Sequence, residues 1–184
     1  MTLTLLHEAI YHSFVNPQSD VSDNTITRPS DWNAAHSVTG AKATVGWDSD
    51  THERGFLVKI VNRTGHASVK GELVSCSTSA NEEAILQNNE YDTIGIAAQT
   101  GISEGSEMWV WSIGSICQVL FKDGQTSTAG NILLAADTDG RAYNISNPGS
   151  GLPAVETHFK ECGHVLETKG AGTDVLVLAS IHFN

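Results

Sequence analysis

From Gly55 onward, short apolar runs alternate with residues that favour turns. Gly, Asn or Asp separates these runs at intervals of roughly eight to twelve residues, which is typical of an all-β domain. No segment after residue 40 keeps the helical period of about 3.6 residues over three turns. The pattern predicts strands over 56–61, 68–74, 91–98, 107–113, 115–122, 131–136, 141–145, 163–167 and 174–183.

Three loops between these strands have the composition of hairpin turns. The loop at 62–66 contains Gly65, which can adopt a left-handed conformation, and would join the first two strands. The Asp-Gly pair within 137–140 would join the strands on either side of it, and 169–172 would join the last two. We therefore expect three antiparallel hairpins.

The strand predicted over 107–113 has apolar side chains on both of its faces. Met108 and Val110 alternate with Trp109 and Trp111, and successive side chains of a strand point to opposite sides. Such a strand is expected to be covered on both faces, either between two layers of this chain or between a sheet and a partner subunit.

The first residues of the chain follow a different pattern. Leu3, Leu6, Ile10 and Phe14 would share one side of a helix, whereas Leu3 and Leu5 alternate with threonines as in a strand. The pattern leaves both structures open and predicts only an N-terminal arm.

A linker and a short helical turn follow this arm. Residues 16–31 are poor in apolar groups and rich in turn formers, whereas a Ser or Asp cap before Trp32 favours a helical turn near 30–36. The expected fold is mainly β, a single antiparallel β-sandwich or barrel-like domain over 41–184, preceded by an arm and short helix over 1–40.

The balance of charge excludes some partners. The chain of 184 residues has 10 Lys and Arg against 21 Asp and Glu, a net charge of −11, and no basic cluster. Binding to nucleic acid or to an anionic membrane depends on concentrated positive charge, so we expect neither partner. No apolar run exceeds Val175–Ala179, and the N-terminus lacks a secretory signal, so synthesis in the host cytoplasm without export is expected.

The three cysteines are odd in number and far apart, which argues against a disulfide framework. Cys76, Cys117 and Cys162 are expected to be reduced thiols packed as small hydrophobic side chains. Disulfides between subunits stay open at this point.

One serine stands in a pattern used by hydrolases. Ser103 lies within G-x-S-x-G at 101–105, and acids and histidines follow it in the chain order of those enzymes: Asp137 or Asp139, then His158, His164 or His182. That arrangement needs a helix after the serine, whereas 107–111 is predicted as a strand. We therefore expect a turn at Ser103 and no enzyme.

Three segments contain residue types that bind metals. Asp48–Asp50 and Asp137–Gly140 each resemble the start of a calcium loop but lack its later ligands, so solvated turns are expected. His158, Cys162 and His164 include two types of zinc ligand without the paired spacing of structural zinc sites. Neither a metal nor another cofactor is predicted.

The segment 24–40 reads Asn-Thr-Ile-Thr-Arg-Pro-Ser-Asp-Trp-Asn-Ala-Ala-His-Ser-Val-Thr-Gly. It resembles a segment near the N-termini of many tailed-phage virion proteins, in which P-S-D-W-N-A-x-H precedes the main β-domain. The same segment also occurs in tail-fibre-like chains. The resemblance implies a virion structural protein.

The last ninety or so residues resemble phage capsid decoration and head-fibre proteins. The resemblance covers a strand that ends in Ala-Ala at 94–98, a hairpin with an Asp-Gly tip at 130–142, a G-x-V-L-E strand at 163–167 and an aliphatic strand at 174–178. It implies a decoration protein that binds the outer surface of the capsid, commonly as a homotrimer. The implied partners are the major capsid protein and a fibre protein; the alternative is a head or tail appendage, such as a fibre base or a baseplate adaptor.

With this resemblance, attachment to the capsid is expected to use apolar side chains of the arm and of the C-terminal strand. For Trp32 the alternative is a cap that packs on its own domain, and for Ile181 and Phe183 core packing is the favoured interpretation. The candidate interface residues are Leu5, Leu6, Ile10, Phe14, Trp32, His36, Ile181 and Phe183.

Overall fold

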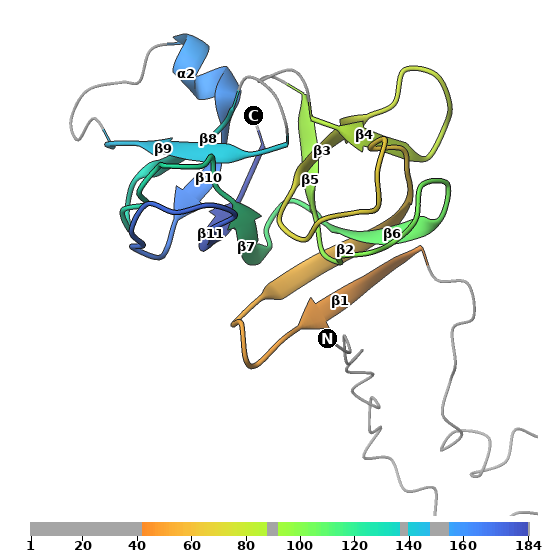
Figure 1. The fold of residues 1–184 in the computed structure, drawn as a ribbon, viewed down its shortest axis with the longest axis horizontal. Helices are drawn as coiled ribbons and strands as arrows, with labels where there is room; N and C mark the ends of the chain where they lie inside the picture. The colour runs from red at the N-terminus through yellow and green to blue at the C-terminus, as the bar shows by residue number, and fades with distance from the viewer. Residues whose placement is uncertain (1–41, 88–91, 137–139, 148–154, 184) are drawn as a thin grey trace, which may run out of the picture. The chain divides into compact units, whose positions relative to one another are not determined.

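The computed structural model describes residues 42–87, 92–136, 140–147 and 155–183, which are mainly β with one short helix (Figure 1). The arm over 1–40 and the helical turn near 30–36 lie outside the described residues. The described elements are β1 (Ala43–Trp47), β2 (Arg54–Asn62), β3 (Leu73–Cys76), β4 (Glu83–Leu86), β5 (Thr93–Ala97), β6 (Glu107–Trp111), β7 (Ile116–Leu120), β8 (Ile132–Ala135), β9 (Ala142–Ile145), α2 (Val155–Lys160), β10 (Glu161–Val165) and β11 (Leu176–Ile181).

Five of the strands close into a small barrel in the order β2, β6, β5, β3, β4. The barrel closes through a parallel pairing of β4 with the end of β2, where Val61 lies opposite Glu83. β1 pairs antiparallel with the first half of β2 and stands outside this ring. The prediction of a mainly β, barrel-like domain is confirmed.

The other five strands pair in the order β7, β11, β10, β8, β9. A single parallel bridge between Phe121, just after β7, and Ala142 of β9 connects the two ends of this series. Among the described strands, the series pairs with the barrel at one residue pair, Arg54 of β2 with Ile116 of β7, and hydrogen bonds outside the strand ladders add to this connection.

Strand β6 separates two apolar clusters. Met108 and Val110 belong to a small cluster within the barrel strands, whereas Trp111 belongs to the main core, against which Trp109 packs. The expectation that this strand is covered on both faces is confirmed. Both coverings come from this chain.

Two of the three predicted hairpins are confirmed. β8 pairs with β9, where Ala135 lies opposite Ala142, and β10 pairs with β11, where Gly163 lies opposite Ile181. The strands β1 and β4 and the helix α2 were not expected from the sequence pattern.

The hairpin predicted at 62–66 is wrong. β2 pairs with β6 and β4, and the next strand begins only at Leu73. Asn62 explains the difference, because its buried side chain donates to the carbonyls of His66 and Ile102 and accepts from Thr64. These bonds hold the chain after β2 as a loop instead of turning it back along the strand.

The cysteines differ from one another in environment. Cys117 and Cys162 are buried in the main core, where burial raises the pKa of both thiols, so these two are packed as expected. Cys76 is exposed at the end of β3, so the expectation that it packs as a hydrophobic side chain is wrong. All three are free thiols.

A buried carboxylate connects three segments where the two groups of strands meet. Glu53, just before β2, is only 2% exposed. It accepts bonds from the backbone N–H of Gln118 in β7 at 2.9 Å, from the Thr51 hydroxyl at 2.7 Å and from the Lys70 ammonium group. A buried charge is costly unless it is paired and hydrogen bonded, so Glu53 requires this arrangement of all three segments.

Gly71 lies beside this junction in a conformation that suits only glycine. Its φ is +90°, its N–H donates to Ala97, and its carbonyl accepts from the N–H of Leu120. A Cβ at this position would lie 2.8 Å from the backbone nitrogen of Leu120, so the close approach of the loop to β7 needs the absence of a side chain.

Gly71→Ala should lower the free energy of unfolding by about 2 to 4 kcal/mol, since it adds a backbone clash to the strain of a left-handed residue. Gly101→Ala is the matched control, because Gly101 has nearly the same φ of +87° but no atom within 4 Å of an added Cβ. The control should cost about 1 kcal/mol. Urea unfolding followed by tryptophan fluorescence measures both, and equal losses would contradict the close-packed junction.

Candidate functional site

The outer face of the β1–β2 pair carries three large apolar side chains that are exposed. Val45 is 61% exposed, Trp47 50% and Phe56 59%. Val45 and Phe56 lie directly opposite each other in the register, and Trp47 lies on the same side of β1 as Val45. We call Val45, Trp47 and Phe56 the β1–β2 apolar face.

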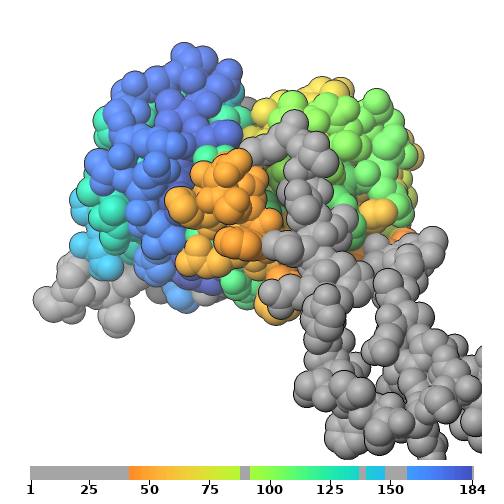
Figure 2. Space-filling view, turned by 90° about the horizontal axis from the view of Figure 1, so that it is seen from below, coloured from red at the N-terminus to blue at the C-terminus, as the bar shows by residue number. Residues whose placement is uncertain are grey.

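This face is supported from behind by the core. A Cβ at Gly46, on the other side of β1, would meet Leu57 and Trp111, so β1 packs closely on the barrel through that side. On the side of the apolar face, Val58 follows Phe56 along β2 and packs against the smaller core cluster. The three side chains are therefore held on a rigid sheet, and Figure 2 shows atoms of β1 and β2 (orange) at the molecular surface.

A fourth exposed apolar side chain comes from the turn after β6. Ile113 is 54% exposed, and the backbone of Ser112 before it donates to the carbonyl of Phe56. Among the described strands, β1 pairs with β2 alone, so its outer edge offers backbone groups for a further strand. An apolar face beside an open edge is suited to binding another chain.

Neither of the two predicted interface residues that the structure describes belongs to this face. Ile181 is 1% exposed in the main core, and Phe183 packs partly buried against the same core, so core packing is the observed state of both. The side chain of Ile181 therefore has no surface left for a partner. The remaining six predicted residues lie outside the described residues: Leu5, Leu6, Ile10, Phe14, Trp32 and His36.

The sequence contained a signal for the β1–β2 apolar face that the prediction did not use. Residues 43–47 read Ala-Thr-Val-Gly-Trp, with alternate positions apolar as in a half-exposed strand. The other two described tryptophans differ: Trp111 is buried, and Trp109 is partly buried with the Lys59 ammonium 5.1 Å from its ring. Packing, as expected, accounts for both of these side chains.

Ser103 lies in an exposed turn, not in a nucleophile elbow. The N–H of Ser106 donates to its carbonyl at 3.0 Å, and strand β6 begins one residue later at Glu107. The expected turn is therefore present, and no helix follows Ser103. Asp137 and Asp139 lie outside the described residues.

The Asp48–Asp50 segment is a turn held by its own first side chain. The Asp48 carboxylate accepts from the backbone N–H groups of Asp50 at 2.9 Å and Thr51 at 3.2 Å. These bonds make an Asx-type turn at the end of β1, as expected for a solvated loop.

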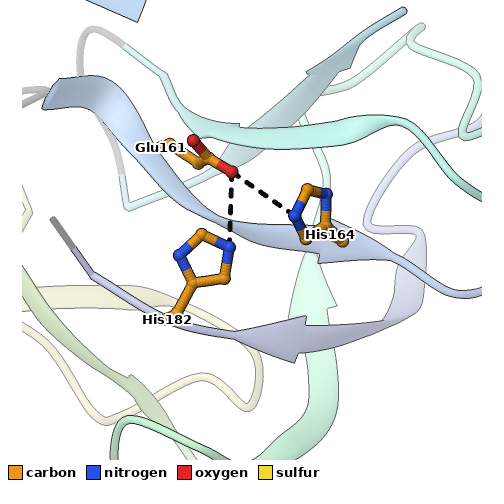
Figure 3. A group of neighbouring side chains, drawn as sticks. All are labelled: Glu161, His164 and His182. Atoms are coloured by element: carbon orange, nitrogen blue, oxygen red, sulfur yellow. Dashed lines mark ion pairs between the residues drawn. The ribbon is translucent and has the colours of Figure 1, made fainter. Parts of the chain in front are cut away.

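Two histidines and one glutamate gather near the end of the chain. Glu161 begins β10, His164 lies later in the same strand, and His182 follows β11. One ligand atom from each residue lies within 4.8 Å of the other two. Figure 3 shows both imidazole rings turned toward the Glu161 carboxylate.

Three imidazole nitrogens lie at similar distances, 3.3 to 3.5 Å, from the carboxylate oxygens of Glu161. His164 Nε2 lies 3.5 Å from Glu161 Oε1, and His182 Nε2 lies 3.3 Å from the same oxygen. His158 of α2 approaches the second carboxylate oxygen, with Nδ1 3.5 Å from Oε2. Glu161 is 9% exposed, whereas the three imidazoles are between 35% and 55% exposed.

A β-bulge brings Glu161 and His164 to the same place. Their odd separation would put them on opposite faces of a regular strand, but the register of β10 against β8 shifts between Glu161 and Gly163. Gly163 permits the bulge, since a Cβ there would lie 2.0 Å from the carbonyl oxygen of Ser180.

The residues with zinc-ligand side chains that the sequence places close together are His158, Cys162 and His164, and the structure brings together a different set. Cys162 is buried, with its Sγ 3.6 Å from the carbonyl oxygen of Leu133. Glu161 and His182 stand beside His164 instead. The only signal in the sequence was the short spacing between residues that can bind zinc. His182 lies far along the chain and reaches the cluster only because β10 pairs with β11.

Burial lowers the pKa of His182. The Glu161 carboxylate opposes this by favouring the imidazolium, and the nearby imidazoles of His164 and His158 lower the pKa further. Near neutral pH His182 is therefore the neutral imidazole, with a lone pair on one ring nitrogen.

No protein-family model matches the sequence. No curated protein matches it either. Among solved structures, the chain is similar to the N base of head fiber gp8.5 in bacteriophage phi29, with 16% sequence identity, coverage of 68% of this chain and 92% of that chain, and a TM-score of 0.47. Of the described residues, none forms a helix long and apolar enough to cross a membrane.

In chelator-treated protein, His182 should titrate below the ordinary histidine value of 6.5, because burial disfavours its charged form. Glu161→Gln should lower the midpoint further, since it removes the charge that favours protonation. Glu104→Gln, on the distant loop before β6, should leave it unchanged. Histidine-selective NMR titration measures the three midpoints, and a rise in Glu161→Gln would contradict the assignment.

Proposed function

We propose that this chain is a structural protein of a tailed-phage virion that binds the outer surface of the capsid as a decoration protein. In this proposal it attaches to the major capsid protein as a homotrimer and stabilises the shell without catalysing a reaction. The sequence resemblance of 24–40 and of the last ninety residues supports the assignment to the structural proteins of tailed-phage virions. The observation that carries the binding role is the β1–β2 apolar face.

The physical properties of this face suit binding of a protein surface. Trp47 and Phe56 are large aromatic anchors, a type that contributes much of the energy in protein interfaces. They stand on a paired sheet, so little conformational entropy is lost when they are covered. Several copies bound to one lattice would convert modest contacts into stable attachment by raising the effective concentration.

The charge of the chain suits an exterior position. A net charge of −11 at pH 7 repels other particles that carry the same coat, which keeps them apart in solution. The partner surface need not be basic, because the side chains of the β1–β2 apolar face carry no charge.

A head or tail appendage, such as a fibre base or a baseplate adaptor, is the second candidate. The P-S-D-W-N-A-x-H segment is compatible with this candidate as well, because the same segment occurs in tail-fibre-like chains. In that function the apolar face would bind a fibre protein or another appendage protein instead of the shell.

The number of copies per particle separates the two candidates. A decoration protein should be present in hundreds of copies that scale with the major capsid protein, because it covers a repeated lattice site. Quantitative mass spectrometry of purified virions, with labelled peptides of both proteins, measures the ratio. A handful of copies would establish the appendage, and absence from the virion would overturn both.

Phe56→Ser should weaken binding to undecorated particles at least tenfold, since it removes a central aromatic anchor. Phe159→Ser is the matched control, because Phe159 is also a phenylalanine and is 53% exposed, but on α2. Cosedimentation with capsids lacking this protein measures both affinities. Full binding by Phe56→Ser, or an equal loss in Phe159→Ser, would contradict the assignment of the face.

A further inference from the structure

We propose that Glu161, His164 and His182 form a binding site for a divalent transition-metal ion, with Zn²⁺ as the ion that suits the donors best. This site lies on β10 and just after β11, on different strands from the β1–β2 apolar face. It is independent of the virion function proposed above.

The donor set suits Zn²⁺. Two imidazole nitrogens and one carboxylate oxygen are the protein ligands of many open tetrahedral zinc sites. Hard ions such as Ca²⁺ prefer ligand sets made of oxygen atoms alone, so this set suits them less well. The carboxylate also offsets one of the two charges of the ion. With three protein ligands, the fourth position is left to water or to an incoming donor.

Two of the three separations between ligand atoms match those around a single ion, and the third is within 4.8 Å. Two ligands at zinc bond lengths in tetrahedral geometry lie roughly 3.3 to 3.4 Å apart. The observed separations from Glu161 Oε1 are 3.5 Å to His164 Nε2 and 3.3 Å to His182 Nε2. Both exceed the usual hydrogen-bond range of about 2.7 to 3.2 Å and are close to the spacing of two ligands on one ion, so side-chain adjustments could complete the site while the strands stay in place.

The surroundings favour an ordered site over a chance cluster. Glu161 is 9% exposed and is placed by the bulge at Gly163, so its carboxylate is held in position. The backbone N–H of His182 donates to the carbonyl of Cys162 at 3.1 Å, which places His182 across from the start of β10. The two histidines remain partly exposed, which gives an ion access from solvent.

Metal binding would stabilise the position of the segment that follows β11. His182 lies after the last strand pair of β11, so a metal shared with Glu161 and His164 would link this segment to β10. An ion that binds only the folded state stabilises that state. At free Zn²⁺ about 100 times its Kd, the thermal midpoint should rise by about 5 to 10 °C.

Titration of the untagged, chelator-treated full-length chain with ZnCl₂ tests the proposal. We expect one equivalent to bind by calorimetry, with the rise in thermal midpoint measured on the same samples. Co²⁺ should give the visible absorption of a tetrahedral nitrogen and oxygen site. His164→Ala and His182→Ala should each weaken Zn²⁺ binding at least tenfold and remove most of the thermal shift.

His66→Ala is the matched control. Like His164, His66 is partly exposed and lies beside a glutamate that is little exposed, with Nε2 3.6 Å from Glu72 Oε1. His66 is not part of the Glu161 cluster. It should bind Zn²⁺ like the original chain. The proposal is overturned if the original chain binds no stoichiometric Zn²⁺, or if His66→Ala weakens binding as much as His164→Ala does.

Discussion

The structure depends on the burial of one charged side chain, Glu53. Its carboxylate is almost fully withdrawn from water, and it is stabilised only because Thr51, Lys70 and Gln118 all reach it. These residues come from the turn before β2, the loop before β3 and strand β7. Removing any one segment would leave a buried charge short of partners, so Glu53 couples the closed barrel to the second group of strands.

The strand topology determines which apolar surface is left exposed. Strands β3 to β6 of the barrel and β7 to β11 bury most of their apolar side chains in two clusters of this chain. β1 is added outside the ring, with only one strand partner among the described residues, so no other described strand covers one of its faces. Val45, Trp47 and Phe56 are exposed there because of this topology. In the function proposed above, this exposed face provides the contact with another protein, and the net negative charge keeps the particles apart.

The cluster of Glu161, His164 and His182 arises from an irregularity in a strand. In a regular β10, Glu161 and His164 would point to opposite faces, and the bulge at Gly163 removes that separation. The pairing of β10 with β11 then adds His182 from 21 residues further along the chain than Glu161. Bulges often occur where a side chain must be redirected for function, which agrees with the metal site proposed for these residues.

The sequence by itself determined the β class, two of the hairpins and the burial of β6 on both faces. These features depend on the alternation of apolar residues and on turn-forming residues, and both patterns extend over only a few positions. Tertiary structure alone decided the closure of the barrel by β4, the loop held by Asn62, and the exposed face of β1. It also selected Glu161 and His182 in place of Cys162 beside His164. These features depend on contacts between residues far apart in the chain, and local pattern carries no information on which distant strand satisfies a polar group or covers an apolar one.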